Sequence, residues 1–311
     1  MTWQRSLSSS RLTDCSANDC RTPPFLGHIV NMAATSLGAY GLRIEGLQEA
    51  AQWMRPVSDS APELEVRLTG DVPPTDVRRI DRDGLDIRLQ GMGDVRVRME
   101  RASRRVDFSF TGRVPPAADV LHPYLGPAAA AAHAWEGREA IHAGAFRTAR
   151  GAVLLLGDKE AGKSSMLAWL SAELDQEVVA DDLCVLQSGA VLPGPACIDL
   201  RDPTALRYGS RWSGQLVRAS ERIRLAVRQG GADPVPVAGT VVLGWADRVR
   251  VESVSPVERL ELIVAQRYFG SLEPDPVAVL DLLSRPMVRL LRPRDLSSLP
   301  AAAEALLAYW S

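Results

Sequence analysis

Polar and apolar residues alternate with a period of two in four short segments of the first third of the chain. These segments are Leu64–Leu68, Leu85–Leu89, Val95–Met99 and Val106–Phe110. Such alternation is typical of strands that bury one face. Turn residues separate the segments, so we expect a smaller, mainly antiparallel β domain over residues 25–115. Residues 1–24 are rich in Ser and Arg and are expected to be a disordered tail.

The pattern changes after residue 115. Residues 115–136 contain an alanine run and are expected to be helix-rich. A strand-like segment, Ala140–Phe146, then precedes the apolar run Val153–Leu156, so we expect the two to pair antiparallel. Further strands are expected at Glu177–Leu186, Ile223–Val227, Val237–Trp245 and Val249–Val254, and helices at Pro256–Phe269, Pro276–Leu283 and Leu296–Trp310. The sequence therefore predicts an α/β domain with a mixed sheet over residues 116–311.

The segment after Val153–Leu156 reads GDKEAGKS and leads into an apolar helical pattern. Strand, glycine-rich loop and helix in this order predict a P-loop (Walker A motif), in which main-chain N–H groups hold phosphate oxygens. Lys163 would contact the β- and γ-phosphates, and the Ser164 hydroxyl would ligate Mg²⁺. The residues assigned to nucleotide binding are Gly157, Asp158, Lys159, Glu160, Ala161, Gly162, Lys163, Ser164 and Ser165.

Lysine usage supports this interpretation of the loop. Of the 36 basic residues, only Lys159 and Lys163 are lysine. A compact charge on a flexible stem suits phosphate contact in a tight loop. The alternative is a glycine-containing turn that matches the motif by chance.

Two adjacent carboxylates, Asp181 and Asp182, interrupt the apolar segment Glu177–Leu186. Ionised Asp within a buried strand is unfavourable unless a cation or hydrogen bonds compensate for it. The pair therefore predicts a Mg²⁺ ligand or a group that takes a catalytic proton. The alternative is a strand end at which both side chains face water.

Composition limits the classes of partner. The chain has 311 residues, 46% of them hydrophobic, and a net charge of −2, which gives no general case for nucleic acid or an anionic membrane. No apolar run approaches the roughly 20 residues that span a bilayer, and the first residues lack an apolar signal core, so we expect a cytoplasmic protein. The four cysteines fit neither a disulfide framework nor a zinc motif, and we expect reduced thiols.

Arginines crowd the polar face of the predicted N-terminal sheet. They are Arg78, Arg79, Arg82, Arg88, Arg96, Arg98, Arg101, Arg104 and Arg105. Acidic neighbours such as Asp81 and Asp86 would balance much of this charge on a solvated face. The alternative is a docking surface for an acidic peptide or protein.

Four elements in order resemble the catalytic domain of bacterial HPr kinase/phosphorylase and its relatives. They are His142, the GDKEAGKS loop, the Asp181–Asp182 pair and Ile198–Arg201, and the likeness covers roughly residues 135–300. The resemblance implies a P-loop kinase core that uses ATP and Mg²⁺ to phosphorylate a hydroxyl group. Asp202 and Pro203 depart from the family pattern, so we expect an acceptor other than HPr.

The resemblance also implies roles for individual residues. The Asp181–Asp182 pair would supply the base, with His142 beside it. Asp199 would support the metal together with Ser164 and Asp182, and Arg201 would stabilise the charge of the transition state.

Three functions follow as alternatives. The first is a kinase for a Ser or Thr hydroxyl of a peptide or small protein, such as a tailoring kinase of the lasso-peptide type. The second is a kinase for a small molecule such as serine. The third is a P-loop NTPase switch without a phosphorylated product. The resemblance also allows a homo-oligomer, because related kinases form hexamers.

Overall fold

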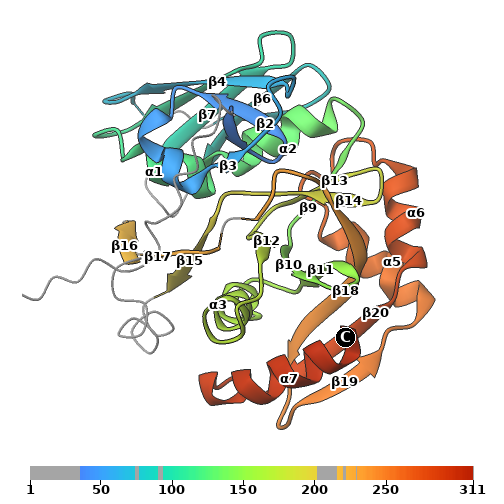
Figure 1. The fold of residues 1–311 in the computed structure, drawn as a ribbon. Helices are drawn as coiled ribbons and strands as arrows, with labels where there is room; N and C mark the ends of the chain where they lie inside the picture. Colours follow the sequence, from blue (N-terminus) through green and yellow to red (C-terminus); the bar gives the residue numbers. More distant parts are fainter. Residues whose placement is uncertain are drawn as a thin grey trace, which may run out of the picture. The chain divides into compact units, whose positions relative to one another are not determined.

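The computed structural model describes residues 36–73, 77–89, 94–201, 216–219, 222–228 and 230–310, with only the backbone described for 216–219 and 222. All of these residues lie within one unit, Thr35–Ser311. They form a mixed α/β structure with three sheets (Figure 1). The predicted disordered tail over residues 1–24 lies outside the described residues.

The N-terminal half folds into an eight-stranded sheet with the order β3-β1-β2-β4-β8-β7-β6-β5. The four segments with alternating patterns become β4, β6, β7 and β8, which confirms the strand predictions. The bounds are β1 Leu37–Ala39, β2 Leu42–Glu45, β3 Arg55–Pro56, β4 Glu63–Thr69, β5 Arg78–Ile80, β6 Gly84–Leu89, β7 Val95–Glu100 and β8 Arg105–Phe110. Pairing is mainly antiparallel, but β4 runs parallel to both β2 and β8. Beside β8 the parallel pairing arises because the chain crosses from β4 to the edge strand β5 and returns through β6 and β7 to β8.

The second half is built on a nine-stranded mixed sheet. Its main path is β12-β10-β11-β18-β14-β13-β9, and β20 extends it by pairing with β18 and β19. The bounds are β9 Glu139–Ile141, β10 Gly144–Thr148, β11 Gly151–Leu156, β12 Val178–Ala180, β13 Cys184–Gln187, β14 Ala190–Leu192, β18 Val235–Trp245, β19 Arg250–Ser253 and β20 Met287–Arg292. Strand β10 pairs antiparallel with β11, as predicted, and β11 pairs parallel with β18.

Helices cover both faces of the β11–β18 region (Figure 1). They are α3 Lys163–Leu174 and α7 Leu299–Trp310 on one face, and α5 Pro256–Ala265 and α6 Pro276–Ser284 on the other. Val153 and Leu155 of β11 pack with α3 and α7, whereas Leu154 packs on the side of α5 and α6. Burial on both faces explains why this strand reads as a continuous apolar run.

A third, small sheet carries the predicted Ile198–Arg201 segment. It contains β15 Cys197–Arg201, β16 Leu216–Ala219 and β17 Arg222–Ala226 in the order β15-β17-β16. The segment therefore belongs to a strand, which the sequence interpretation had not assigned.

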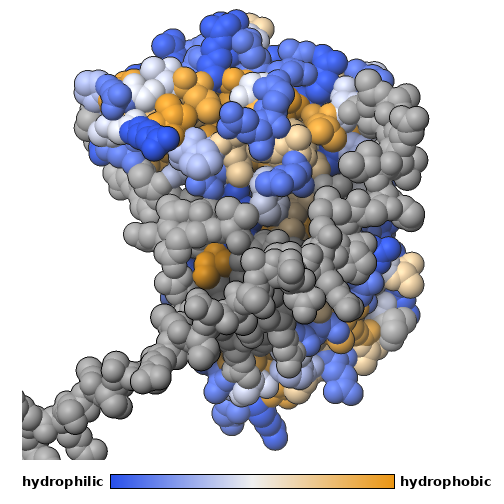
Figure 2. All heavy atoms as spheres, turned by 60° about the vertical axis from the view of Figure 1, so that its left-hand side comes forward, coloured by the Kyte–Doolittle hydropathy of each residue, from blue (hydrophilic) through white to orange (hydrophobic). Residues whose placement is uncertain are grey.

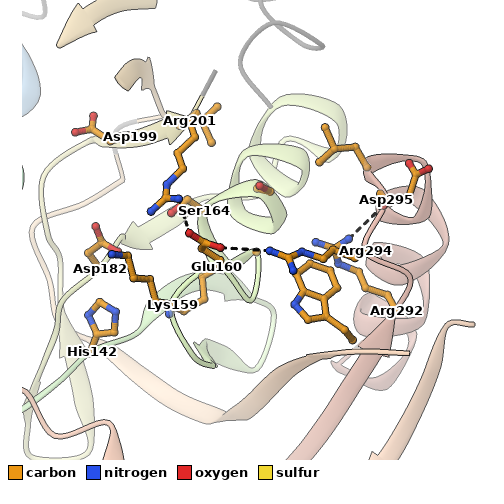
Figure 3. Close-up of a pocket in the computed structure, with 16 residues that line it drawn as sticks. His142, Lys159, Glu160, Ser164, Asp182, Asp199, Arg201, Arg292, Arg294 and Asp295 are labelled. Carbon is orange, nitrogen blue, oxygen red and sulfur yellow. Dashed lines mark hydrogen bonds and ion pairs between the residues drawn. The ribbon is translucent and has the colours of Figure 1, made fainter. Parts of the chain in front are cut away.

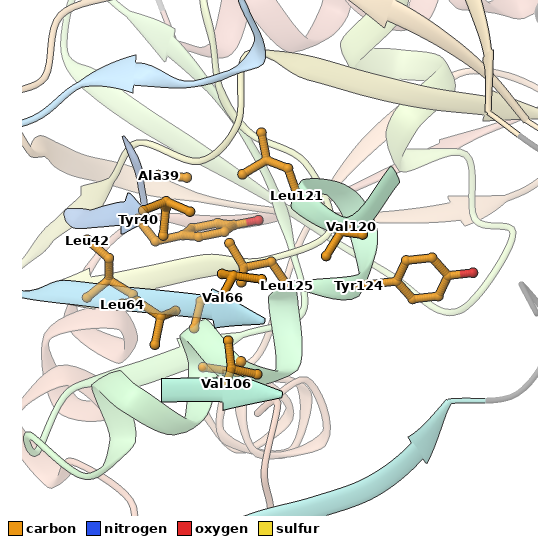
Figure 4. Close-up of a cluster of buried hydrophobic side chains, with 14 of the residues drawn as sticks. Ala39, Tyr40, Leu42, Leu64, Val66, Val106, Val120, Leu121, Tyr124 and Leu125 are labelled. Carbon is orange, nitrogen blue, oxygen red and sulfur yellow. The ribbon is translucent and has the colours of Figure 1, made fainter. Parts of the chain in front are cut away.

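The predicted helix-rich connection, residues 115–136, contains α1 Ala117–Asp119, a π-helical turn Val120–Tyr124 and α2 Gly126–Ala134. Within the turn, the peptide bond between His122 and Pro123 is cis, and His122 has an extended backbone. The apolar side chains of the turn and of the following Leu125 pack against β2, β4 and β8 (Figure 4). The same core includes Val185 and Leu192 of the nine-stranded sheet, so the two larger sheets share buried contacts.

Two buried polar groups join the N-terminal sheet to the rest of the unit. The Arg55 guanidinium, 1% exposed, donates hydrogen bonds to the carbonyls of Gly194 (2.8 Å) and Val178 (2.6 Å). His133 of α2 shares a 2.7 Å hydrogen bond with the carbonyl of Tyr40. The division at residue 115 stays a prediction.

The arginine-rich face of the N-terminal sheet is neutralised locally. Arg88 pairs with Asp94, and Arg96 with Asp86 at 2.6 Å. Figure 2 shows hydrophilic and hydrophobic side chains interleaved over this part of the molecule. Local pairing of this kind is what the solvated-face interpretation predicted, and the docking alternative stays a prediction.

Two further observations bear on the composition-based expectations. Both cysteines that the structure describes, Cys184 and Cys197, are buried and free. Along the described residues, no helix combines the length and the apolar character that a bilayer crossing requires.

Burial makes His133 a source of pH-dependent stability. Desolvation, followed by the charge of Arg138, lowers the pKa of His133 from 6.5 to about 3. The unfolded chain therefore binds a proton at this residue below pH 6.5 that the folded chain does not bind. As the pH falls from 7 to about 5, we expect this residue to lower the free energy of unfolding by about 2 kcal/mol. Above pH 7 the residue is neutral in both states and has no such effect.

Urea unfolding at about pH 7 and about pH 5 would measure this effect. The variant His133→Gln keeps a side-chain donor but cannot titrate, so it should lose about 2 kcal/mol less than the wild type on acidification. Equal losses in the two proteins would contradict the assignment.

Candidate functional site

Residues Gly157–Ser164, here called the 157–164 loop, connect β11 to α3. Gly157 has φ +147° and Gly162 has φ +90°, values that disfavour a side chain. A Cβ on Gly162 would also lie 2.5 Å from a guanidinium nitrogen of Arg292. The glycines thus allow the close path of the backbone from the strand to the N-terminus of a 12-residue helix, where unpaired N–H groups favour an anion.

Lys163 lies at the first position of α3 and is only 7% exposed. Its Nζ donates to the carbonyls of Gly157 (2.7 Å) and Asp158 (3.3 Å). Burial lowers the pKa of Lys163, and the charges of Asp182 and Asp181 oppose this shift. The ammonium is therefore held over the 157–164 loop by main-chain oxygens.

Strand pairing explains why His142 meets the acidic pair. Ala145 of β10 pairs with Ala180 of β12, and Ile141 of β9 pairs with Cys184 of β13. Ile141 lies four residues before Ala145, and Cys184 lies four residues after Ala180. The two pairs therefore share one antiparallel register, which continues across the residues between the strands. This register puts Ala143 opposite Asp182, next to His142.

The two aspartates occupy different environments. Asp181 is 1% exposed and accepts a 3.1 Å hydrogen bond from the Ser164 hydroxyl. Asp182 is less buried and has φ +63°, a left-handed backbone that Asp adopts more readily than most residues. Burial and the nearby Lys163 lower the pKa of His142, opposed by the charge of Asp182 and a hydrogen bond to its backbone. These shifts favour a neutral imidazole beside Asp182.

A pocket of about 540 Å³ contains most of the predicted site (Figure 3). His142 and Asp182 lie at one end, and Arg292 and Arg294 at the other, with Glu160 between them. The lining residues are His142, Lys159, Glu160, Gly162, Lys163, Ser164, Ser165, Asp182, Asp199, Leu200, Arg201, Trp245, Arg292, Arg294, Asp295 and Leu296.

Ion pairs and stacking define the far end of this pocket. Glu160 accepts hydrogen bonds from Arg201 (2.6 Å) and Arg294 (3.3 Å). The hydrogen bond from Arg201 is the main reason why the pKa of Glu160 is lowered. The Arg292 guanidinium lies 4.5 Å from the centre of the Trp245 ring, a distance typical of a cation–π contact.

Asp199 is fixed by a buried ion pair. Both of its carboxylate oxygens accept hydrogen bonds from Arg224, at 2.7 Å and 2.9 Å. Arg224 is 1% exposed and also donates to the carbonyls of Ala118 and His122. Asp199 thus lines the pocket, and its carboxylate binds Arg224, which in turn contacts main-chain carbonyls of residues 117–124.

Four predicted site residues lie outside the lining of this pocket. Gly157 and Asp158 line a neighbouring hollow with His142 and Tyr268. Ala161, 6% exposed, and Asp181 are buried. The other predicted residues share the main pocket, and their roles stay predictions.

Several pocket residues were missed by the sequence interpretation. Trp245 ends a predicted strand, whereas Arg292 ends β20, which was not predicted. His122 was also missed, although it forms a group with Asp181 and Asp182 in which one potential ligand atom from each residue lies within 4.8 Å of the others. A histidine followed by proline inside a helical pattern was the only available hint of an irregular turn there.

Comparison with known proteins gives little further information. No protein-family model and no curated protein matches the chain. Among solved structures, the chain is similar to the HPr(Ser) kinase/phosphatase from Coxiella burnetii, with 14% sequence identity and a TM-score of 0.23. The alignment covers 55% of this chain and 90% of that chain. At that TM-score the likeness carries no argument about activity.

The Asp199–Arg224 pair should matter for stability. The variant Asp199→Asn would leave the buried Arg224 guanidinium with only Asp119, at 3.5 Å, as a charged partner, so we expect a loss of about 3 kcal/mol in the free energy of unfolding. Urea unfolding would measure it.

Asp86→Asn is a matched control, because Asp86 also binds an arginine, Arg96, through both oxygens but on a partly exposed strand face. A loss below about 1 kcal/mol is expected there. Similar losses in the two variants would contradict the role assigned to burial.

Proposed function

We propose that this chain is an ATP- and Mg²⁺-dependent kinase that transfers the γ-phosphate to a Ser or Thr hydroxyl of a peptide or small protein. One observation carries the proposal: the 157–164 loop and Asp182 line the same pocket, and Ser164 contacts Asp181 at 3.1 Å. Phosphoryl transfer to an alcohol needs a phosphate cradle, cations over the developing charge and a carboxylate near the acceptor.

The donor set near Ser164 fits Mg²⁺. A hydroxyl and carboxylate oxygens are the ligands that this ion prefers, and Asp181 is already hydrogen-bonded to Ser164. We assign Ser164 and Asp182 to the ion, with Asp199 supporting the site through Arg224. When bound, Mg²⁺ would neutralise charge on the β- and γ-phosphates.

The chain's own groups would then perform three tasks. Main-chain N–H groups of the 157–164 loop and the α3 N-terminus would bind phosphate oxygens, and Lys163 would leave its carbonyl partners to contact them. Asp182 would accept the proton of the incoming hydroxyl, with neutral His142 orienting it. Arg201 would stabilise the spreading charge after exchanging Glu160 for phosphate oxygens.

The proposal also covers the family of this chain and the roles of its two parts. We assign residues 116–311 to a divergent catalytic domain of HPr kinase type, and residues 25–115 to substrate recognition or oligomerisation. Trp245 at the far end of the pocket offers an aromatic surface for a nucleotide base. A cytoplasmic location and a homo-oligomeric state are part of the proposal.

A small-molecule kinase is the second candidate, with free serine as an example of the acceptor. The observation that favours it is the local pairing of arginines on the N-terminal sheet, such as Arg96 with Asp86 at 2.6 Å. A face neutralised in this way offers little net charge to an acidic peptide. Competition between short serine peptides and free serine in a transfer assay would separate the two candidates.

The variant Asp182→Asn tests the proposal. It should lower phosphoryl transfer by about 10²- to 10⁴-fold, because loss of a general base has effects of this size, while ATP affinity stays within a few-fold. Transfer from γ-labelled ATP to free serine, to serine peptides and to candidate peptides encoded beside the gene would be measured, together with binding of a fluorescent ATP analogue.

Asp175→Asn is a matched control, because Asp175 also has a left-handed backbone (φ +50°) but caps the far end of α3. It should transfer phosphate at the wild-type rate. Full transfer by Asp182→Asn would refute the assignment of the base. ATP hydrolysis with no labelled acceptor in any assay would favour the NTPase switch instead.

A further inference from the structure

One imidazole and two carboxylates converge beside the pocket that Asp182 lines. His122 comes from the turn between α1 and α2, and Asp181 and Asp182 come from the gap between β12 and β13. One potential ligand atom from each residue lies within 4.8 Å of the other two. Ligand atoms that each lie about 2.0–2.2 Å from one ion are at most about 4.4 Å apart, so small side-chain adjustments would bring these three atoms to a common ion.

The histidine is held in place by the surrounding structure. Arg224, anchored by Asp199 at 2.7 Å, donates a hydrogen bond to the His122 carbonyl. The His122 side chain is buried, with 2% of its residue surface exposed. The bond from Arg224 fixes the backbone position from which the imidazole projects.

The local charge also favours a cation. Asp181 and Asp182 are adjacent carboxylates, and the first is 1% exposed. After burial, the charge of Asp182 adds to the upward shift in the pKa of Tyr268. Adjacent carboxylates in a poorly solvated site repel each other. The charge of Lys163 acts on both of them, and a bound cation would stabilise the pair further.

We propose that His122, Asp181 and Asp182 form a divalent-cation site that prefers a first-row transition metal ion such as Mn²⁺ to Mg²⁺. The reason is the donor set. Mg²⁺ prefers oxygen ligands, whereas imidazole suits first-row transition metals such as Fe²⁺ and Zn²⁺. Mn²⁺ belongs to the same series and also suits the two carboxylates, and electron paramagnetic resonance detects it. Asp182 would use one oxygen for the ion and would keep the second oxygen facing the pocket.

This inference rests on the proposed function only for its consequence: in a kinase, the ion held by His122, Asp181 and Asp182 would take the place of the Mg²⁺ assigned above to Ser164 and Asp182. Metal binding itself needs neither nucleotide nor acceptor. The two proposals can therefore fail separately.

Electron paramagnetic resonance of the full chain, stripped of metal and free of nucleotide, would test the site with Mn²⁺. We expect one bound Mn²⁺ per chain, with nitrogen modulation in the pulsed spectrum from a directly bound imidazole. His122→Gln should remove the nitrogen modulation and weaken Mn²⁺ binding at least about tenfold. Mg²⁺ should displace Mn²⁺ only at a concentration at least about tenfold higher.

His142→Gln is the matched control, since His142 lies beside the same acidic pair. It should keep the nitrogen modulation. Loss of the modulation in His142→Gln, its persistence in His122→Gln, or no Mn²⁺ binding without nucleotide would each overturn the site.

A second variant keeps the test valid if His122→Gln does not fold. The double variant His28→Gln/His142→Gln leaves only His122 and His133 as histidines. Both ring nitrogens of His133 are already engaged, by Tyr40 at 2.7 Å and by Arg138 at 2.9 Å. Nitrogen modulation in this variant would support His122 as the ligand, and its absence would overturn the site.

A transfer assay with Mg²⁺ separates this inference from the proposed function. Phosphorylated product from the wild type without a nitrogen-bound Mn²⁺ would leave the kinase proposal standing and refute the His122 site. A nitrogen-bound Mn²⁺ without phosphorylated product from any acceptor would support the His122 site and refute the kinase proposal.

Discussion

The hydrogen bond between Ser164 and Asp181 joins the two halves of the candidate site. Ser164 belongs to the first turn of α3, and Asp181 follows β12, the edge strand of the nine-stranded sheet. At 3.1 Å, this contact fixes the acidic pair at the end of the helix where an anion would bind. A carboxylate so close to a phosphate site is unfavourable without a cation, because the two negative charges repel. The contact therefore sets the requirement for positive charge that Lys163 and a metal ion would meet.

Local sequence patterns predicted the parts of the fold that depend on local physics. Strands such as β7 and β8 have one buried face, and this face repeats every second residue whatever lies against it. The 157–164 loop was predictable because its glycines adopt backbone angles that other residues avoid. His142 and Asp182 were expected to be neighbours only through a family resemblance. The common register of β9–β10 and β12–β13 gives the physical reason, and it requires knowledge of strand pairing.

Long-range contacts account for what the sequence did not predict. Arg224 looks like one more charged residue in an alternating strand, but it is 1% exposed and binds Asp199. Its burial depends on the 117–124 segment, more than a hundred residues earlier in the chain. His122 was overlooked for the same reason, since only the folded chain brings it near Asp181. Strand β20 was missed because two arginines interrupt its otherwise apolar run. One of them, Arg292, packs on Trp245 in the folded chain, a contact that the sequence does not show.

Backbone strain within the site argues for a chemical role of the acidic pair. Asp182 and Glu160 both have left-handed φ angles, +63° and +72°, and both line the pocket. Such conformations are less favourable for residues other than glycine and persist when the surrounding structure enforces them. At Asp182, the strand pairs on both sides of the gap enforce the turn, and the turn aims the carboxylate at the pocket. Exposed turns such as those at Asp71 and Asp175 have the same backbone conformation, so what distinguishes Asp182 is that its carboxylate lines the pocket, where a fixed direction would benefit a group that meets an incoming hydroxyl.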